Sequence, residues 1–136
     1  MPRRLFDTNF LIGHWRRFPE DTRERTPDAM REWARELIGL HGTKLICTPV
    51  LIEMFAGTTN AKELELHRAY LGEFDVIDGR KLPASVWDSA LRLAQHVPSN
   101  SSIKRRHLGD CLIRSVADHF HCEVLTGDKA MRRLPR

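Results

Sequence analysis

The feature that most constrains the fold is an alternation of short apolar runs with longer amphipathic segments. The apolar runs predict buried strands at 4–7, 44–47, 74–77 and 123–126. Between them, helical spacing of apolar side chains predicts helices at 9–15, 27–41, 49–57, 61–71, 83–97 and 108–120. Strands that alternate with helices are typical of a parallel sheet flanked by helices, so the sequence predicts the α/β class.

Two helices carry recognisable signals at their ends. Thr26 supplies a capping hydroxyl and Pro27 suits the first helical position, so a helix is predicted to begin there. Gly42 is placed to end it. Thr48 and Pro49 repeat the cap-plus-proline pattern and predict another helix start.

Length and charge set broad limits on what the chain can be. Its 136 residues correspond to one domain, 1–136, because domains span roughly 100 to 200 residues. The formal net charge is +4 at pH 7, a mild excess that favours an anionic partner. No apolar stretch approaches the about 20 residues that a membrane-spanning helix needs.

The cysteines indicate a reducing environment. There are three, an odd number, and none forms a CxxC pair. Cys111 and Cys122 are expected on one helix, about 16 Å apart along its axis and too far for a disulfide. We therefore expect free, buried thiols and a cytoplasmic protein.

Four carboxylates occupy positions that suggest a shared site. Asp7 ends the first predicted strand and Asp128 follows the last, and ligands of open α/β sheets bind beyond the carboxyl ends of strands. Glu53 interrupts an apolar helix, and Asp110 lies in the first turn of another. Each acid alone has a structural explanation: Asp110, for example, can interact with the helix dipole or pair with Arg114.

Taken together, the four acids favour a metal site. Carboxylates gathered in one cleft repel one another unless they share a cation. Mg²⁺ or Mn²⁺ prefers such oxygen ligands, and the histidines and cysteines show no zinc-like spacing. Basic residues near these acids in sequence are weaker candidates for contact with a polyanion such as RNA: Lys104, Arg105, Arg106, Arg114 and Lys129.

Four segments, in this order, resemble the motifs of PIN domains, which are small Mg²⁺-dependent ribonucleases. Leu5-Phe6-Asp7-Thr8-Asn9 is similar to their opening motif, and Thr48 to Gly57, with Glu53, is similar to the second. Leu108 to Ile113 and Val124 to Lys129 resemble the third and fourth. The resemblance covers almost the whole chain and is closest to the VapC toxins of toxin–antitoxin pairs.

The resemblance implies a fold, a site and partners. The fold would be a three-layer α/β/α sandwich with a short central parallel sheet of four to five strands. Asp7, Glu53, Asp110 and Asp128 would hold Mg²⁺ or Mn²⁺ and carry catalysis, with Asn9 and Thr126 as supporting polar residues. The activity would be cleavage of RNA by metal-activated water in the cytoplasm. A cognate antitoxin would inhibit it, and the protein would form a homodimer.

Other functions stay open from the sequence. An aspartyl-phosphate enzyme would also place an acid such as Asp7 after a strand, but Asp7-Thr8-Asn9 lacks the second Asp two residues on. A non-catalytic RNA- or protein-binding module could keep the fold. The aromatic residues of this chain, such as Trp33, Phe55 and Trp87, fall at helical core spacing. Proteins that bind single-stranded nucleic acid instead expose aromatic side chains on which bases stack. An RNA-processing nuclease outside toxin–antitoxin systems is the remaining alternative.

Overall fold

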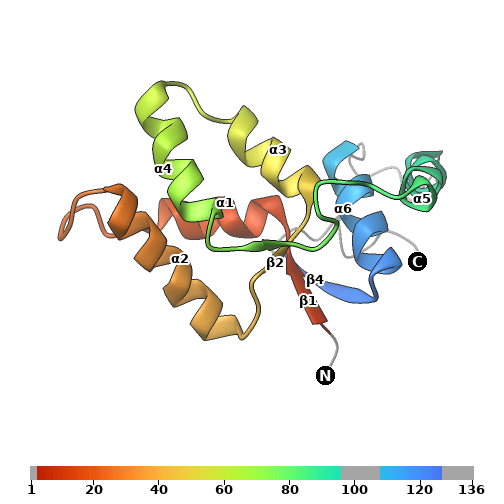
Figure 1. Cartoon of the computed structure of the whole chain (residues 1–136), viewed down its shortest axis with the longest axis horizontal. Helices are drawn as coiled ribbons and strands as arrows, with labels where there is room; N and C mark the ends of the chain where they lie inside the picture. The colour runs from red at the N-terminus through yellow and green to blue at the C-terminus, as the bar shows by residue number, and fades with distance from the viewer. Residues whose placement is uncertain (1–2, 96–107, 127–136) are drawn as a thin grey trace, which may run out of the picture.

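A four-stranded parallel sheet forms the centre of the molecule (Figure 1). The structure is a computed structural model and describes residues 3–95 and 108–126. The strand order is β3-β2-β1-β4. The strands are β1 (Arg3–Phe6), β2 (Leu45–Ile46), β3 (Asp75–Val76) and β4 (Cys122–Leu125).

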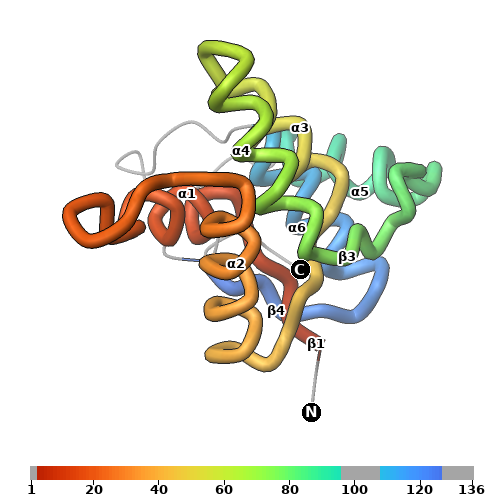
Figure 2. Tube along the Cα trace, turned by 60° about the vertical axis from the view of Figure 1, so that its left-hand side comes forward, coloured from red at the N-terminus to blue at the C-terminus, as the bar shows by residue number. Residues whose placement is uncertain are grey.

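Helices connect these strands and cover the sheet. They are α1 (Thr8–Arg16), α2 (Pro27–His41), α3 (Thr48–Ala56), α4 (Ala61–Leu71), α5 (Ala84–Gln95) and α6 (Leu108–His119). Helices α2 and α4 pack together at one end of the molecule, and α5 and α6 pack together at the other (Figures 1 and 2). The predicted α/β/α architecture is confirmed, with four strands in the described residues.

The register of the sheet decides which residues meet at its carboxyl edge. Phe6 of β1 lies opposite Leu125 of β4, and Leu5 lies opposite Leu45 of β2. The ladder continues one residue past β1, since the amide of Asp7 donates to the carbonyl of Leu125 at 3.1 Å. Asp7 and Thr126, which follow these two strands, are therefore neighbours at the same edge.

The core is built where the strands contact the helices. Leu5, Phe6 and Ile46 from the sheet are fully buried. Val50 of α3 and Val116 of α6 are buried against them in the same cluster. Burial of each such side chain contributes about 1.5–3 kcal/mol, so these contacts hold α3 and α6 against the sheet.

The predicted ends of α2 are confirmed. Thr26 is the N-cap, and its hydroxyl accepts a hydrogen bond from the amide of Ala29 at 3.1 Å. Pro27 occupies the first helical position. Gly42 ends the helix in the left-handed region at φ 67°, a conformation that glycine adopts without steric cost.

The prediction for the start of α3 is wrong in one respect. Thr48 is the first helical residue, and Cys47 is the N-cap without a side-chain capping hydrogen bond. The hydroxyl of Thr48 points instead to Asp78, a residue from the segment after β3. The sequence pattern could not show this partner, because it comes from a distant part of the chain.

The expectation that Cys111 and Cys122 share one helix is also wrong. Helix α6 ends at His119, and His121 adopts a positive φ of 57° that turns the chain. Cys122 then begins β4. The three cysteines are free, and Cys47 and Cys111 are buried.

No helix in the described segments is long and apolar enough to cross a membrane.

Candidate metal centre

Asp7 is fixed at the carboxyl edge by two local features. It directly follows β1 and is the N-cap of α1, where its Oδ1 accepts a hydrogen bond from the amide of Phe10 at 2.7 Å. Its backbone amide is bound to β4. The residue is only 2% exposed, so its carboxylate is held in one place inside the edge.

Glu53 of α3 reaches across to the segments that carry Asp7 and Asp110. The hydroxyl of Thr8, the residue after Asp7, donates to Oε1 of Glu53 at 2.7 Å. The same carboxylate lies against Gly109, the residue before Asp110. A Cβ atom at position 109 would lie 2.5 Å from Oε1 and 2.7 Å from Oε2 of Glu53. Three segments far apart in sequence thus meet at this carboxylate.

The pKa of the buried thiol of Cys47 also reflects carboxylates near this edge. The pKa of Cys47 is raised to about 12, chiefly by burial and in part by the nearby carboxylates of Asp78, Glu53 and Asp7. Because charge interactions of this kind act over short distances, these three carboxylates face the same region at the end of β2. At neutral pH the side chain of Cys47 is therefore a neutral thiol.

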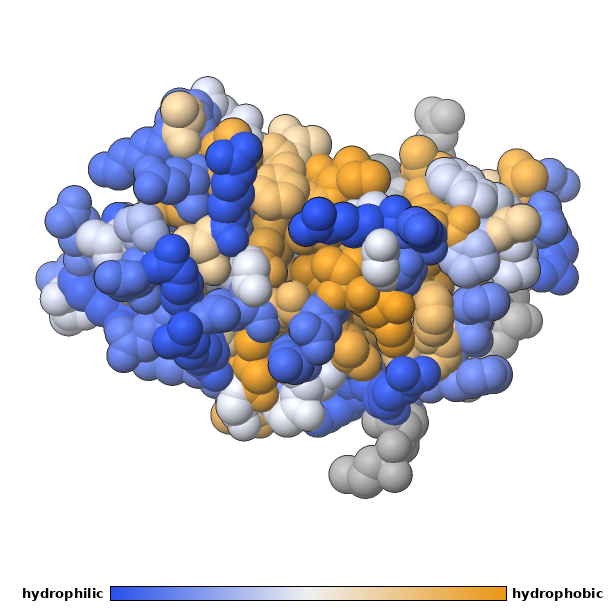
Figure 3. Space-filling model, in the orientation of Figure 1, coloured by the Kyte–Doolittle hydropathy of each residue, from blue (hydrophilic) through white to orange (hydrophobic). Residues whose placement is uncertain are grey.

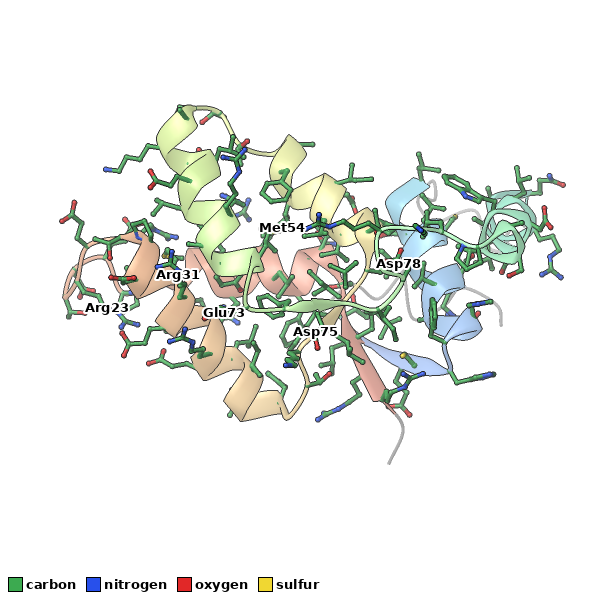
Figure 4. All side chains as sticks on the ribbon, viewed as in Figure 1. Arg23, Arg31, Met54, Glu73, Asp75 and Asp78 are labelled. Carbon is green, nitrogen blue, oxygen red and sulfur yellow. The ribbon has the colours of Figure 1, made fainter. Side chains whose placement is uncertain are left out.

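Asp78 is a site-adjacent residue that the sequence reasoning missed. It is buried and lies in the segment after β3 (Figure 4). It accepts hydrogen bonds from the amide of Thr48 at 3.1 Å and from its hydroxyl at 2.9 Å. Asp78 therefore satisfies an amide in the first turn of α3, the helix that carries Glu53. A signal was present, because Asp78 follows the strand at 74–77 much as Asp7 follows the first strand.

The remaining predicted residues lie around this edge or outside the described segments. Asp110 is half-buried in the first turn of α6. Thr126 is buried directly after β4, and Asn9 is exposed in the first turn of α1. Asp128 lies outside the described residues. We refer below to Asp7, Glu53, Asp78 and Asp110 as the carboxylate edge.

The donor atoms at this edge suit a hard divalent cation. Asp7, Glu53 and Asp110 offer oxygen ligands, and the space that Gly109 leaves open is filled by a carboxylate. Within residues 3–95 and 108–126, no group of three His, Cys, Asp or Glu side chains is close enough to hold a metal ion.

The predicted basic contacts are mostly outside the described part of the chain. Lys104, Arg105, Arg106 and Lys129 lie there. Arg114 is described, and it differs from the expectation of an exposed RNA contact. It is 8% exposed, and its Nε lies 3.2 Å from Oδ1 of Asp118.

The parallel sheet and its carboxylate edge define an α/β protein with a candidate divalent-cation site. A family model described as the PIN domain matches residues 4–136, and the chain belongs to this family. PIN domains are typically nucleases that act on RNA and generally use divalent metal ions. Comparisons with curated proteins and with solved structures found no match.

Proposed function

We propose that this chain, as a single domain over residues 1–136, is a Mg²⁺- or Mn²⁺-dependent endoribonuclease. The observation that carries the proposal is the position of Glu53. Its carboxylate contacts Thr8 and Gly109, the chain neighbours of Asp7 and Asp110. These contacts support a site in which the acids that follow β1 and lie on α3 and α6 would act together at the carboxyl edge of the sheet, where ligands of α/β proteins bind.

The chain's own residues would prepare this site for a phosphodiester. Asp7, Glu53, Asp110 and Asp128 would hold the ion, and Asn9 and Thr126 would support them. A bound divalent ion supplies Lewis-acid activation of water and neutralises charge on the phosphate. The capping bond to Asp7 and the Thr8 bond to Glu53 restrict both carboxylates before substrate arrives.

RNA would reach the site along basic residues. We propose Lys104, Arg105, Arg106 and Lys129 for phosphate contacts, since they flank two of the acids in sequence. Arg114 is left out of this set because it is buried and bound to Asp118.

A cleavage assay with a matched variant tests the proposal. We expect purified protein to cut single-stranded RNA with Mg²⁺ or Mn²⁺ and to lose activity in EDTA. Asp7→Asn should lower the rate by about 100-fold or more. Asparagine still accepts the helix-capping hydrogen bond, so this variant should fold. Asp88→Asn makes the same change at an exposed position of α5 and should cleave normally.

Two results would reject the activity. One is full cleavage by Asp7→Asn, which would show that the preparation cuts RNA without this edge. The other is cleavage that EDTA leaves unchanged.

We further propose that the protein is a cytoplasmic toxin of the VapC type, homodimeric and inhibited by a cognate antitoxin. A groove of about 780 Å³ between α3, α4 and β3 supports a protein partner. Its apolar lining includes Leu51, Ile52, Phe55, Leu71 and Phe74, and apolar surface is visible in the middle of this face (Figure 3). The charged residues that line it are Arg68 and Arg80, which suits an antitoxin segment with apolar and acidic side chains.

Charge reversal in the groove tests this partner. If a small frame beside the gene encodes the antitoxin, that protein should suppress RNA cleavage. Arg68→Glu should weaken the inhibition by about 10-fold or more and leave cleavage itself unchanged. Arg92→Glu, at an exposed site on α5, is the control. Equal inhibition of all three proteins would place the antitoxin elsewhere, and light scattering would report the homodimer.

A further inference from the structure

Glu53 presents its carboxylate under unusual conditions. The residue is exposed on α3, and a glutamate side chain has three rotatable bonds that are normally mobile at a surface. Here one oxygen is fixed by the hydroxyl of Thr8, which is itself buried. A ligand that is held in this way loses less freedom when a cation binds.

Gly109 is the second residue that affects the position of the Glu53 carboxylate, because its lack of a side chain leaves room for it. A Cβ at this position would lie 2.5, 2.6 and 2.7 Å from the three carboxylate atoms of Glu53. Real Cβ contacts essentially never fall below 3.0 Å. Any other residue at 109 would therefore displace the carboxylate.

The need for glycine at 109 is one of space and not of backbone conformation. In the described residues, the glycines with positive φ are Gly42 and Gly79. Gly109 is the second residue of α6, where alanine would form the helix more readily than glycine. The chain thus keeps a weaker helix former where the carboxylate of Glu53 needs room. The first turn of a helix also attracts a negative charge.

We propose that Thr8 and Gly109 are positioning residues that together form a cradle for the Glu53 carboxylate. The cradle holds this carboxylate in the orientation in which it binds a divalent cation beside Asp7 and Asp110. This inference rests on the proposed metal-dependent function and assigns roles within it to two residues that are not among the proposed metal ligands.

The test measures Mn²⁺ affinity and unfolding temperature on the full-length chain, with no RNA present. Gly109→Ala should weaken Mn²⁺ binding by about 10-fold or more, as loss of supporting contacts around metal ligands typically does. Its unfolding temperature without metal should stay equal or rise, because the helix former improves. Gly39→Ala is the matched control, since a Cβ there meets no atom within 4 Å. It should leave Mn²⁺ affinity unchanged.

Thr8 variants give a second arm that does not depend on Gly109. Thr8→Val keeps the shape and removes the hydroxyl, so Mn²⁺ affinity should fall by about 5-fold or more. Thr8→Ser restores the hydroxyl and should restore the affinity. If Thr8 served only to stabilise the fold, Thr8→Val would have a lower unfolding temperature, and Thr8→Ser would not restore Mn²⁺ affinity.

The possible outcomes distinguish failure of the cradle proposal from failure of the proposed metal-dependent function. If Gly109→Ala and Thr8→Val bind Mn²⁺ as tightly as the unaltered protein, the cradle is wrong. The proposed function then still stands as long as Asp7→Asn loses binding. If the unaltered protein binds no Mn²⁺ up to millimolar concentrations, both proposals are overturned together.

Discussion

Two regions of this molecule gather ionisable or polar side chains, and they do so in opposite ways. The first is an aromatic cluster between α1, α2 and α4, formed by His14, Trp15, Trp33, His67 and Tyr70. The second is the carboxylate edge. In the aromatic cluster, His14 stacks on Trp33 with ring centroids 4.3 Å apart, and its Nδ1 lies 2.7 Å from the hydroxyl of Tyr70.

The groups of the aromatic cluster satisfy one another. The indole of Trp33 donates to the backbone carbonyl of His14 at 2.9 Å, and the rings of Trp15 and His67 lie together with centroids 4.1 Å apart. At the carboxylate edge, like charges converge instead. No ion pair of Glu53 or Asp78 with a cationic side chain occurs in the described segments. The comparison teaches that mutually satisfied groups stabilise the fold in the aromatic cluster, whereas the carboxylate edge keeps negative charges that a bound cation would neutralise under the proposed function.

The largest expected effect breaks the aromatic cluster. Tyr70 is fully buried and contacts His14, Trp15 and Phe74. Tyr70→Ala should lower the free energy of unfolding by about 3–5 kcal/mol, because the neighbouring rings cannot fill the cavity. Urea unfolding measures this value. Tyr70→Phe, which loses only the hydroxyl, should cost about 1–2 kcal/mol. Equal and small losses for both variants would contradict a tightly packed cluster.

The next effect concerns pH. Burial lowers the pKa of His14 from 6.5 to about 4, and the charges of Arg17 and His41 contribute to the shift. Between these two values the unfolded chain binds a proton that the folded chain does not. The stabilisation from neutral His14 is therefore complete above pH 6.5 and is lost as the pH falls toward 4, by about 2 kcal/mol at pH 5.

Urea unfolding at pH 7 and pH 5 checks this prediction. His14→Gln should show a smaller loss of stability over this range than the unaltered protein. His119→Gln removes an exposed histidine and should keep the full loss. The same pH dependence in all three proteins would mean that His14 titrates normally.

A smaller effect probes the structural member of the carboxylate edge. Asp78→Ala removes the acceptor for the amide and hydroxyl of Thr48 and should cost about 1–2 kcal/mol of unfolding free energy. Asp75→Ala, at an exposed residue of β3, should cost less. A gain in stability for Asp78→Ala would show that repulsion among the acids outweighs its hydrogen bonds.

The smallest effect has the opposite sign. Glu53→Gln keeps the acceptor for Thr8 and removes one negative charge from the edge. Without metal and at low salt, it should raise the free energy of unfolding by a few tenths of a kcal/mol. Added Mg²⁺ should then raise the unfolding temperature of the unaltered protein more than that of the variant. An equal response to Mg²⁺ in both proteins would contradict a role for Glu53 in holding the ion.

Local patterns allowed the sheet and most helices to be predicted from the sequence. Thr26 and Gly42 mark the ends of α2 because capping depends only on neighbouring residues. Trp87 shows the limit of such patterns. It lies at helical core spacing but is 49% exposed, because α5 buries Val86, Ala90 and Leu93 instead. Periodicity alone does not show which face of a helix meets its neighbour.

The acids of the candidate site could be predicted from the sequence, but the contacts between them and their neighbours could not. The motifs marked Asp7, Glu53 and Asp110, yet nothing in their spacing showed the contacts of Thr8 and Gly109 with Glu53. Asp78 was missed for the same reason. Its partner, Thr48, comes close only through the pairing of β2 with β3. Long-range register decides such contacts, and local sequence does not encode it.

The central claim is that the carboxylate edge holds a divalent cation for RNA cleavage. The most direct measurement is the anomalous difference density of a crystal grown with Mn²⁺. The account predicts a Mn²⁺ peak within about 2.0–2.4 Å of carboxylate oxygens from at least two of Asp7, Glu53 and Asp110. A map without a peak at this edge, in crystals that hold Mn²⁺ elsewhere on the protein, would contradict it.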